Sequence, residues 1–82
     1  MRQLRAFVTL VQQGSITAAA QSLGMAQSTI SEALSSLERA MGTSLFLRRR
    51  GSHELVLTDA GNALLPHARS VLEVITAAHV AV

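Results

Sequence analysis

The spacing of apolar and polar residues predicts three consecutive helices in the first half of the chain. In residues 2–13 apolar positions recur every three or four residues, as in an amphipathic helix; they are Leu4, Phe7, Val8 and Val11. Gly14 is expected to end this helix, because glycine is a common helix stop. A shorter helix is predicted over residues 17–23, between a capping residue, Ser15, and a second glycine stop, Gly24.

The third predicted helix, over residues 27–41, has two faces of opposite character. Its apolar face is formed by Ile30, Ala33, Leu34, Leu37 and Met41. Its polar face is formed by Ser28, Ser31, Glu32, Ser35 and Arg39. Gly42 ends the helix, whereas Ala26 stands where a capping hydroxyl would be expected at its start. We therefore expect the apolar face to pack in the core and the polar face to remain open.

The second half of the chain predicts a β-hairpin and then one long helix. The segments over residues 44–48 and 54–57 are short and rich in β-forming residues, and a turn signal containing Gly51 separates them. Thr58 is a good N-cap for the long helix. Asp59 adds a negative charge at the positive end of the helix dipole.

Apolar residues continue along the long helix in alternating steps of four and three, which is the seam pattern of a coiled coil. They are Leu64, Ala68, Val71, Ile75, Ala78 and Val82. Pro66 falls inside this helix and is expected to kink it, because proline lacks a backbone donor. We predict a homodimer interface made by Leu64, Ala68, Val71, Leu72, Ile75 and Ala78. Because the pattern stops at an apolar valine, we interpret the chain as a piece of a longer protein.

Composition narrows the class of protein further. The 82 residues suffice for one small domain with an aliphatic core, because Phe7 and Phe46 are the only aromatic residues. The chain has no cysteine, which excludes disulfides and thiolate metal sites. It carries neither a signal peptide nor an apolar run long enough to span a membrane. The three histidines, His53, His67 and His79, lack metal-ligand spacing, so we expect no enzyme, metal or cofactor.

The second and third predicted helices carry the spacing of a helix-turn-helix. Counted from Ile16, small, permissive and apolar residues fall at the offsets that let two helices cross around a tight turn. They are Ala20, Gly24, Met25, Ile30 and Ala33. In that geometry the third helix is the recognition helix, and its first residues enter the major groove of DNA. These candidate base-reading residues are Gln27, Ser28, Thr29, Ser31 and Glu32.

Positive charge is concentrated in the predicted hairpin. All seven basic residues are arginine, and Arg48, Arg49 and Arg50 are consecutive. A hairpin after a helix-turn-helix makes a winged helix, and arginines on the wing would hold phosphates or enter the minor groove. The predicted fold class is therefore mainly α. A winged helix-turn-helix occupies residues 1–57, and a linker and dimerisation helix occupies residues 58–82.

Three segments resemble the N-terminal domain of LysR-type transcriptional regulators: LRAFVTLVQQGSITAAAQSLGMAQSTISEALSSLE, MGTSLFLRR and LVLTDAGNALLPHA. The resemblance implies a bacterial, cytoplasmic DNA-binding domain that dimerises through the long helix. An effector-binding domain of periplasmic-binding-protein type normally follows, and full-length members are usually tetramers that bind interrupted palindromes in double-stranded DNA. The resemblance also implies base reading by Gln27, Ser28, Ser31 and Glu32. It implies backbone or minor-groove contacts for Thr17 and Arg48, helped by Arg49 and Arg50.

The recognition helix departs from the family pattern in three places. Ser28 stands where the family often has proline, and Ser35 and Ser36 stand where basic residues are often found. Glu32 also replaces a frequent basic residue; it could accept from N4 of cytosine or pair with an arginine. These departures bear on the base preference and leave the expected fold unchanged.

Two other functions fit the same residues. The winged helix could bind an acidic protein partner through its arginines, and affinity that depends on DNA sequence would separate this reading from the first. The chain could also be another helix-turn-helix regulator, such as a short stand-alone repressor. The apolar, uncapped end of the last helix argues against that reading.

Overall fold

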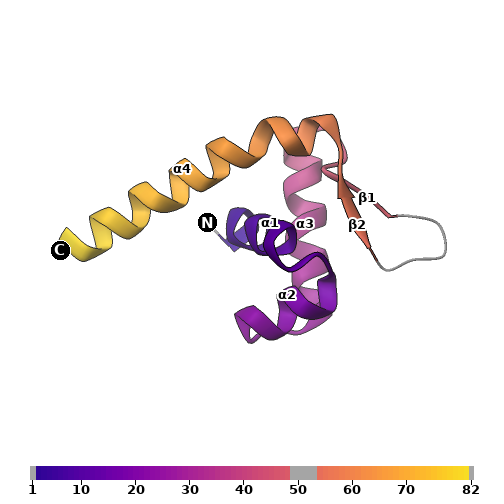
Figure 1. The fold of residues 1–82 in the computed structure, drawn as a ribbon, viewed down its shortest axis with the longest axis horizontal. Helices are drawn as coiled ribbons and strands as arrows, with labels where there is room; N and C mark the ends of the chain where they lie inside the picture. Colours follow the sequence, from indigo (N-terminus) through magenta and orange to yellow (C-terminus); the bar gives the residue numbers. More distant parts are fainter. Residues whose placement is uncertain (1, 49–53, 82) are drawn as a thin grey trace.

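Four helices and one two-stranded sheet make up the residues that the computed structural model describes, 2–48 and 54–81. The helices are α1 (Arg2–Gln13), α2 (Ile16–Leu23), α3 (Gln27–Met41) and α4 (Asp59–Ala81), and the strands are β1 (Phe46–Arg48) and β2 (Leu55–Leu57). The hairpin stands at one side of the three-helix body, and the far end of α4 projects from it (Figure 1). The predicted winged helix-turn-helix followed by a long helix is confirmed.

Caps on the helices explain why α2 and α3 meet at a tight turn. The hydroxyl of Ser15 accepts from the N–H of Ala18 (3.1 Å) and so caps the start of α2, as predicted. At the other end Gly24 has a φ of +63°, which glycine adopts without strain. The N–H of Met25 then donates to the carbonyl of Ala20 (2.9 Å), and this bond reverses the chain toward α3.

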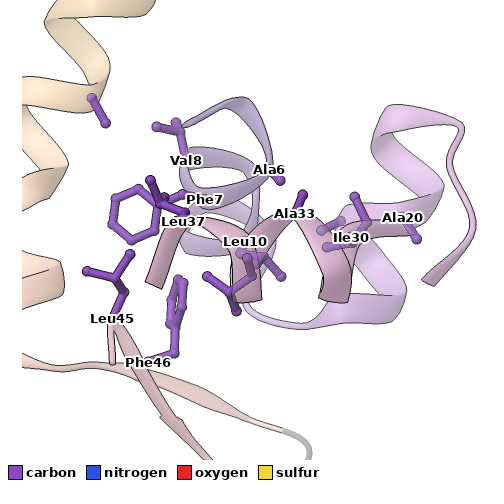
Figure 2. Packing of buried hydrophobic residues seen from close by; sticks show 13 residues of the cluster. Ala6, Phe7, Val8, Leu10, Ala20, Ile30, Ala33, Leu37, Leu45 and Phe46 are labelled. Carbon is purple, nitrogen blue, oxygen red and sulfur yellow. The ribbon is translucent and has the colours of Figure 1, made fainter. Parts of the chain in front are cut away.

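The core is built from side chains of all three N-terminal helices and the start of the wing. The largest fully buried residues are Phe7, Leu10, Ile30 and Leu45, and Figure 2 shows them converging. Burial of each such side chain contributes about 1.5–3 kcal/mol. The ring of Phe7 packs on that of Phe46, with centroids 5.5 Å apart and planes tilted by 58°. The two aromatic residues therefore join α1 to the wing.

The wing is an antiparallel hairpin in which one face is anchored and the other is open. Its register pairs Phe46 with Leu57, Leu47 with Val56, and Arg48 with Leu55. Four residues of the anchored face and the strand entry pack in or on the core; they are Leu45, Phe46, Leu55 and Leu57. Leu47 and Val56 point the other way and are 60% and 39% exposed. The predicted turn around Gly51 and the predicted contact residues Arg49 and Arg50 lie outside the described residues.

Two predictions of side-chain position are wrong. Met41 was assigned to the apolar face of α3, yet it is 48% exposed. Its angular position fits the face, but the buried part of that face ends at Leu37. Ala68 was assigned to an intermolecular seam, yet it is 1% exposed because α4 packs on α1 within the same chain. Ala68 therefore has no surface left for a partner.

α4 combines a packed face with an exposed apolar one. Leu64, Leu65 and Leu72 are partly buried against the core, so this helix adds to the same body as the residues before it. Val71 and Val74 are 38% and 67% exposed. The helix continues without interruption through Pro66. None of the helices among the described residues is long and apolar enough to cross a membrane.

Candidate nucleic-acid interface

The polar face of α3 is the uncovered side of the helix-turn-helix. Four buried residues hold the opposite side against the rest of the body: Ile30, Ala33, Leu34 and Leu37. Because this buried face fixes the rotation of α3 about its axis, Gln27, Ser28 and Glu32 are held on the exposed side. No side chain caps the start of α3, where Ala26 is the N-cap residue. A partner approaching there meets the positive end of the helix dipole.

A hollow of about 170 Å³, here called the wing hollow, lies where α2, α3 and the wing meet. It is lined by Ser15, Ile16, Thr17, Gln27, Ser31, Arg48 and Leu55. Four of these, Thr17, Gln27, Ser31 and Arg48, are sequence-predicted contact residues that come from three separate elements. Together they present two hydroxyls, an amide and a permanently charged guanidinium, groups that suit phosphate oxygens and base edges.

A groove continues from the wing hollow between α3 and the wing. Both are lined by Ile16, Ser31, Arg48 and Leu55. The groove adds Leu34, Ser35, Glu38 and Phe46. Glu38 brings a carboxylate into this otherwise neutral or cationic lining, and its Oε2 accepts from the N–H of Leu45 (2.6 Å). The groove thus follows the recognition helix for about two turns beyond Ser31.

A second hollow, here called the α1 hollow, opens on the other flank of α3. It is lined by Arg2, Gln3, Thr29, Glu32, Ala33 and Ser36. Arg2 and Glu32 therefore face a common space, with Thr29 from the first turn of α3 beside them. The exposed face of α3 consequently has an arginine on each flank: Arg48 from the wing and Arg2 from the start of α1.

The structure divides the predicted contact residues into three groups. Thr17, Gln27, Ser31 and Arg48 share the wing hollow, whereas Thr29 and Glu32 line the α1 hollow. Ser28 is exposed on α3 and lines neither. Arg49 and Arg50 lie outside the described residues.

Sequence reasoning did not select four residues that line these hollows and the groove: Arg2, Gln3, Ser36 and Glu38. A signal existed for Arg2, because a cation at a helix start is a poor match to the helix dipole and so suggests another use. For the other three there was no such signal, because periodicity does not reveal which second element lies beside a residue.

A family model described as "Bacterial regulatory helix-turn-helix protein, lysR family" matches residues 1–62. The chain belongs to the LysR family. The match runs from α1 through the wing and into the first turn of α4, so it covers every element that lines the two hollows and the groove.

Curated LysR-type relatives are considerably longer than this chain. A probable hydrogen peroxide-inducible genes activator of Mycobacterium xenopi is 43% identical over 74 residues, which cover 90% of this chain and 38% of the relative. A protein of the same description from Mycobacterium avium is 43% identical over 70 residues, 85% of this chain and 22% of the relative. The chain thus spans well under half the length of these relatives.

Solved LysR-type structures share the fold at useful sequence identity. The CbnR DNA-binding domain in a complex with DNA has a TM-score of 0.87 and 33% identity, covering 95% of this chain and 87% of that one. The BenM DNA-binding domain in a complex with benA site 1 DNA has a TM-score of 0.81 and 33% identity, covering 92% and 85%. OxyR of Corynebacterium glutamicum in its oxidized form has a TM-score of 0.84 and 36% identity, covering 92% and 22%.

Metal-ligating side chains do not gather into a site in the part of the chain that the structure describes. Residues 2–48 and 54–81 contain no group of three or more histidine, cysteine or acidic side chains that could hold a metal ion. The family to which the chain belongs consists of transcriptional regulators, which are not enzymes.

Proposed function

We propose that this chain binds double-stranded DNA sequence-specifically, as the DNA-binding part of a bacterial transcriptional regulator. The observation that carries the proposal is the wing hollow, in which Thr17, Gln27, Ser31 and Arg48 from α2, α3 and β1 converge. The solved DNA complexes of CbnR and BenM support it, because their DNA-binding domains have the same fold.

The start of α3 reads bases in the major groove. Gln27 is its first residue, and glutamine can bond adenine with two hydrogen bonds. Ser28 and Ser31 can bond several bases, and Glu32 can accept from N4 of cytosine. A good bidentate pair contributes about 1–3 kcal/mol of discrimination, so we expect Gln27 to carry the largest share of the specificity.

The wing and the start of α2 hold the DNA backbone. Arg48 at the end of β1 contacts phosphate or the minor groove, and the hydroxyl of Thr17 in the first turn of α2 bonds a phosphate. Arg49 and Arg50, which lie outside the described residues, add to the same contact. These contacts supply affinity and register and carry little sequence information.

The chain forms a homodimer through α4 and so binds an interrupted palindrome. The exposed valines of α4, Val71 and Val74, support this interface, and Ile75 and Ala78 continue it. α4 has 23 residues and is about 35 Å long, comparable to the roughly 34–36 Å between half-sites one turn apart. In the whole protein, which we expect to be cytoplasmic, two such dimers make a tetramer.

Selection of bound sequences from a random duplex pool tests the proposal. We expect the 82-residue chain to enrich two half-sites of inverted symmetry at a fixed separation. A single enriched half-site would support DNA reading and argue against the dimer. A pool that stays random at physiological salt, where nonspecific binding is weakened, would reject sequence-specific binding altogether.

A second candidate function is contact with another protein through the outer face of the wing. Leu47 and Val56 are cross-strand partners and are 60% and 39% exposed, which is unusual for two adjacent large apolar residues on a small domain. An acidic partner could then add contacts to the wing arginines. Retention of DNA binding by a Leu47→Ser, Val56→Ser double variant, with loss of partner capture, would separate this function from the first.

A further inference from the structure

The base of the wing is fixed to α3 by the side chain of Glu38, which is not among the proposed DNA-contacting residues. Leu45 is the first buried residue after the turn that follows α3, and its side chain is 0% exposed. Its N–H donates to Oε2 of Glu38 over 2.6 Å, across seven residues of sequence. A carboxylate acceptor makes this bond stronger than an ordinary backbone bond. Glu38 therefore ties the entry of β1 to the last turn of α3.

The other side of Leu45 and its neighbour is tied to α4. The carbonyl of Leu45 accepts from the N–H of Thr58 (3.0 Å), and the carbonyl of Ser44 accepts from the Thr58 hydroxyl (2.7 Å). That hydroxyl in turn accepts from the N–H of Gly61 in the first turn of α4 (3.0 Å). The start of β1 is consequently held from two sides, and Glu38 supplies the only one of these bonds that comes from α3.

An acidic residue at Glu38 is costly for a surface that binds a polyanion. Glu38 lines the same groove as Arg48 and Ser31, which the proposed function brings close to phosphates. Its negative charge opposes DNA binding there, so electrostatics alone would favour a neutral residue. The hydrogen bond to Leu45 gives the carboxylate a compensating use.

Arg48 lies only three residues after Leu45 along an extended strand, a span of about 10 Å. Strand β1 has three residues, which follow directly from Leu45 and pair with β2, so the orientation of the chain at Leu45 is passed along the strand to Arg48. A small rotation at Leu45 therefore displaces the Arg48 side chain relative to α3. The bond from Glu38 sets the distance between the base-reading helix and the wing arginine.

We propose that Glu38 is a positioning residue for DNA binding, which acts through the wing by fixing Arg48 beside the recognition helix. This inference rests on the proposed function and names the residue that joins its two contact elements. Glu38 itself touches no DNA in this assignment.

A pair of substitutions separates the hydrogen bond of Glu38 from its charge. Glu38→Gln and Glu38→Ala both remove the negative charge, but only glutamine keeps an acceptor oxygen for the N–H of Leu45. We expect Glu38→Gln to bind the selected duplex at least as tightly as the wild type. We expect Glu38→Ala to bind three- to tenfold more weakly than Glu38→Gln, as measured by fluorescence anisotropy at one fixed salt concentration.

The same pair in an Arg48→Ala background tests whether the effect passes through the wing. If Glu38 acts by placing Arg48, the ratio between the Gln and Ala variants falls toward one when Arg48 is absent. A ratio that stays unchanged would overturn the inference, because a purely structural loss weakens binding in both backgrounds. Equal affinity of Glu38→Gln and Glu38→Ala in the chain that retains Arg48 would overturn it as well.

Two further measurements keep the outcome clear. Circular dichroism establishes whether each variant is folded. If Glu38→Ala is unfolded, Glu38→Asp is compared with the wild type instead. Aspartate keeps the negative charge, but its side chain is one methylene too short to reach the N–H of Leu45. Failure of the wild type to prefer any sequence would reject the proposed function itself. A selective wild type with equal Gln and Ala variants would reject only the role of Glu38.

Discussion

Gly61 lies so close to the carbonyl oxygen of Leu45 that no side chain fits between them. A Cβ added at position 61 would meet that oxygen at a separation that real Cβ atoms essentially never show. The oxygen cannot turn away freely, because it accepts from the N–H of Thr58. The first turn of α4 and the entry of the wing are thus in backbone-to-backbone contact.

Gly61→Ala is expected to destabilise the chain despite its gain in helix propensity. Alanine gains up to about 1 kcal/mol over glycine inside a helix, whereas forcing an extra carbon into a packed site costs about 1–3 kcal/mol. Because the obstacle is backbone, the cost lies toward the upper end and the net loss is about 1–2 kcal/mol. Thermal unfolding should show Tm lowered by about 5–15 °C.

Asn62→Ala provides the matched control for Gly61→Ala. It lies in the same turn of α4, is exposed, and should change Tm little. A Gly61→Ala variant at least as stable as the wild type would mean that the wing entry moves aside at no cost, contrary to the packing at Leu45.

Gln27→Ala should weaken binding to the selected duplex and leave nonspecific binding unchanged. Gln27 is exposed at the start of α3, so its removal leaves no cavity in the core. Loss of one bidentate base contact costs about 1–3 kcal/mol, which is roughly a 5- to 150-fold rise in Kd for the selected sequence. Titration against the selected and a scrambled duplex at the same salt measures it. Equal losses on both duplexes would remove Gln27 from the base-reading set.

Arg48→Ala should weaken binding to every sequence and reduce its salt dependence. Each phosphate contact contributes about 0.9 to the slope of log K against log salt, so the slope should fall by about one per chain. Arg69→Ala serves as the control, since Arg69 is equally charged and exposed but belongs to α4 and lines none of the hollows. If the two variants had the same slope, the assignment of Arg48 to the backbone contact would be wrong.

Arg2→Ala tests whether the α1 hollow belongs to the DNA-facing surface. Arg2 shares that hollow with Thr29 and Glu32 of the recognition helix. If it contacts a phosphate on that flank, its loss reduces the salt slope by about one per chain, as for Arg48. If Arg2 serves only to neutralise Glu32, Arg2→Ala leaves the salt slope of DNA binding unchanged. In a Glu32→Gln background, Arg2→Ala then has no effect on sequence preference.

Periodicity and capping chemistry predicted most of the fold, because they are local. Ser15, Gly24 and Thr58 act at the helix ends where the sequence put them. The apolar stripe of α3 also gave the correct face, but it could not give the length over which neighbours cover that face, and Met41 is exposed for this reason. A stripe shows which side is apolar and leaves open what covers it.

Of the candidate site, the sequence supplied the recognition helix and one wing arginine but not the relation between them. The sequence pattern assigned no role to Glu38, because its bond to Leu45 depends on how the chain turns after Gly42. Arg2 is 27 residues before Thr29 in the sequence, and only the packing of α1 on α3 brings the two into one hollow. Both contacts arise from tertiary packing, which a local sequence pattern does not predict.

The proposed dimer interface on α4 shows the same limit of local sequence patterns. The coiled-coil spacing selected Ala68, which packs inside the chain, and passed over Val74, which is 67% exposed. Val71, Val74 and Ala78 are spaced by three and four residues, so they are surface neighbours on α4. We therefore expect the contact between two chains to centre on Val74 and Val71.

Val74→Asp should convert the proposed dimer into a folded monomer. Placing two carboxylates in an apolar seam removes favourable burial and adds like-charge repulsion, while the exposed position spares the core. Sedimentation equilibrium measures the association. Thr76→Asp adds the same charge to an exposed position on the other side of α4 and should remain dimeric. If both variants stay dimeric, the two chains meet through a surface other than the valines of α4. If the wild type is itself monomeric, α4 needs a further part of the protein in order to dimerise.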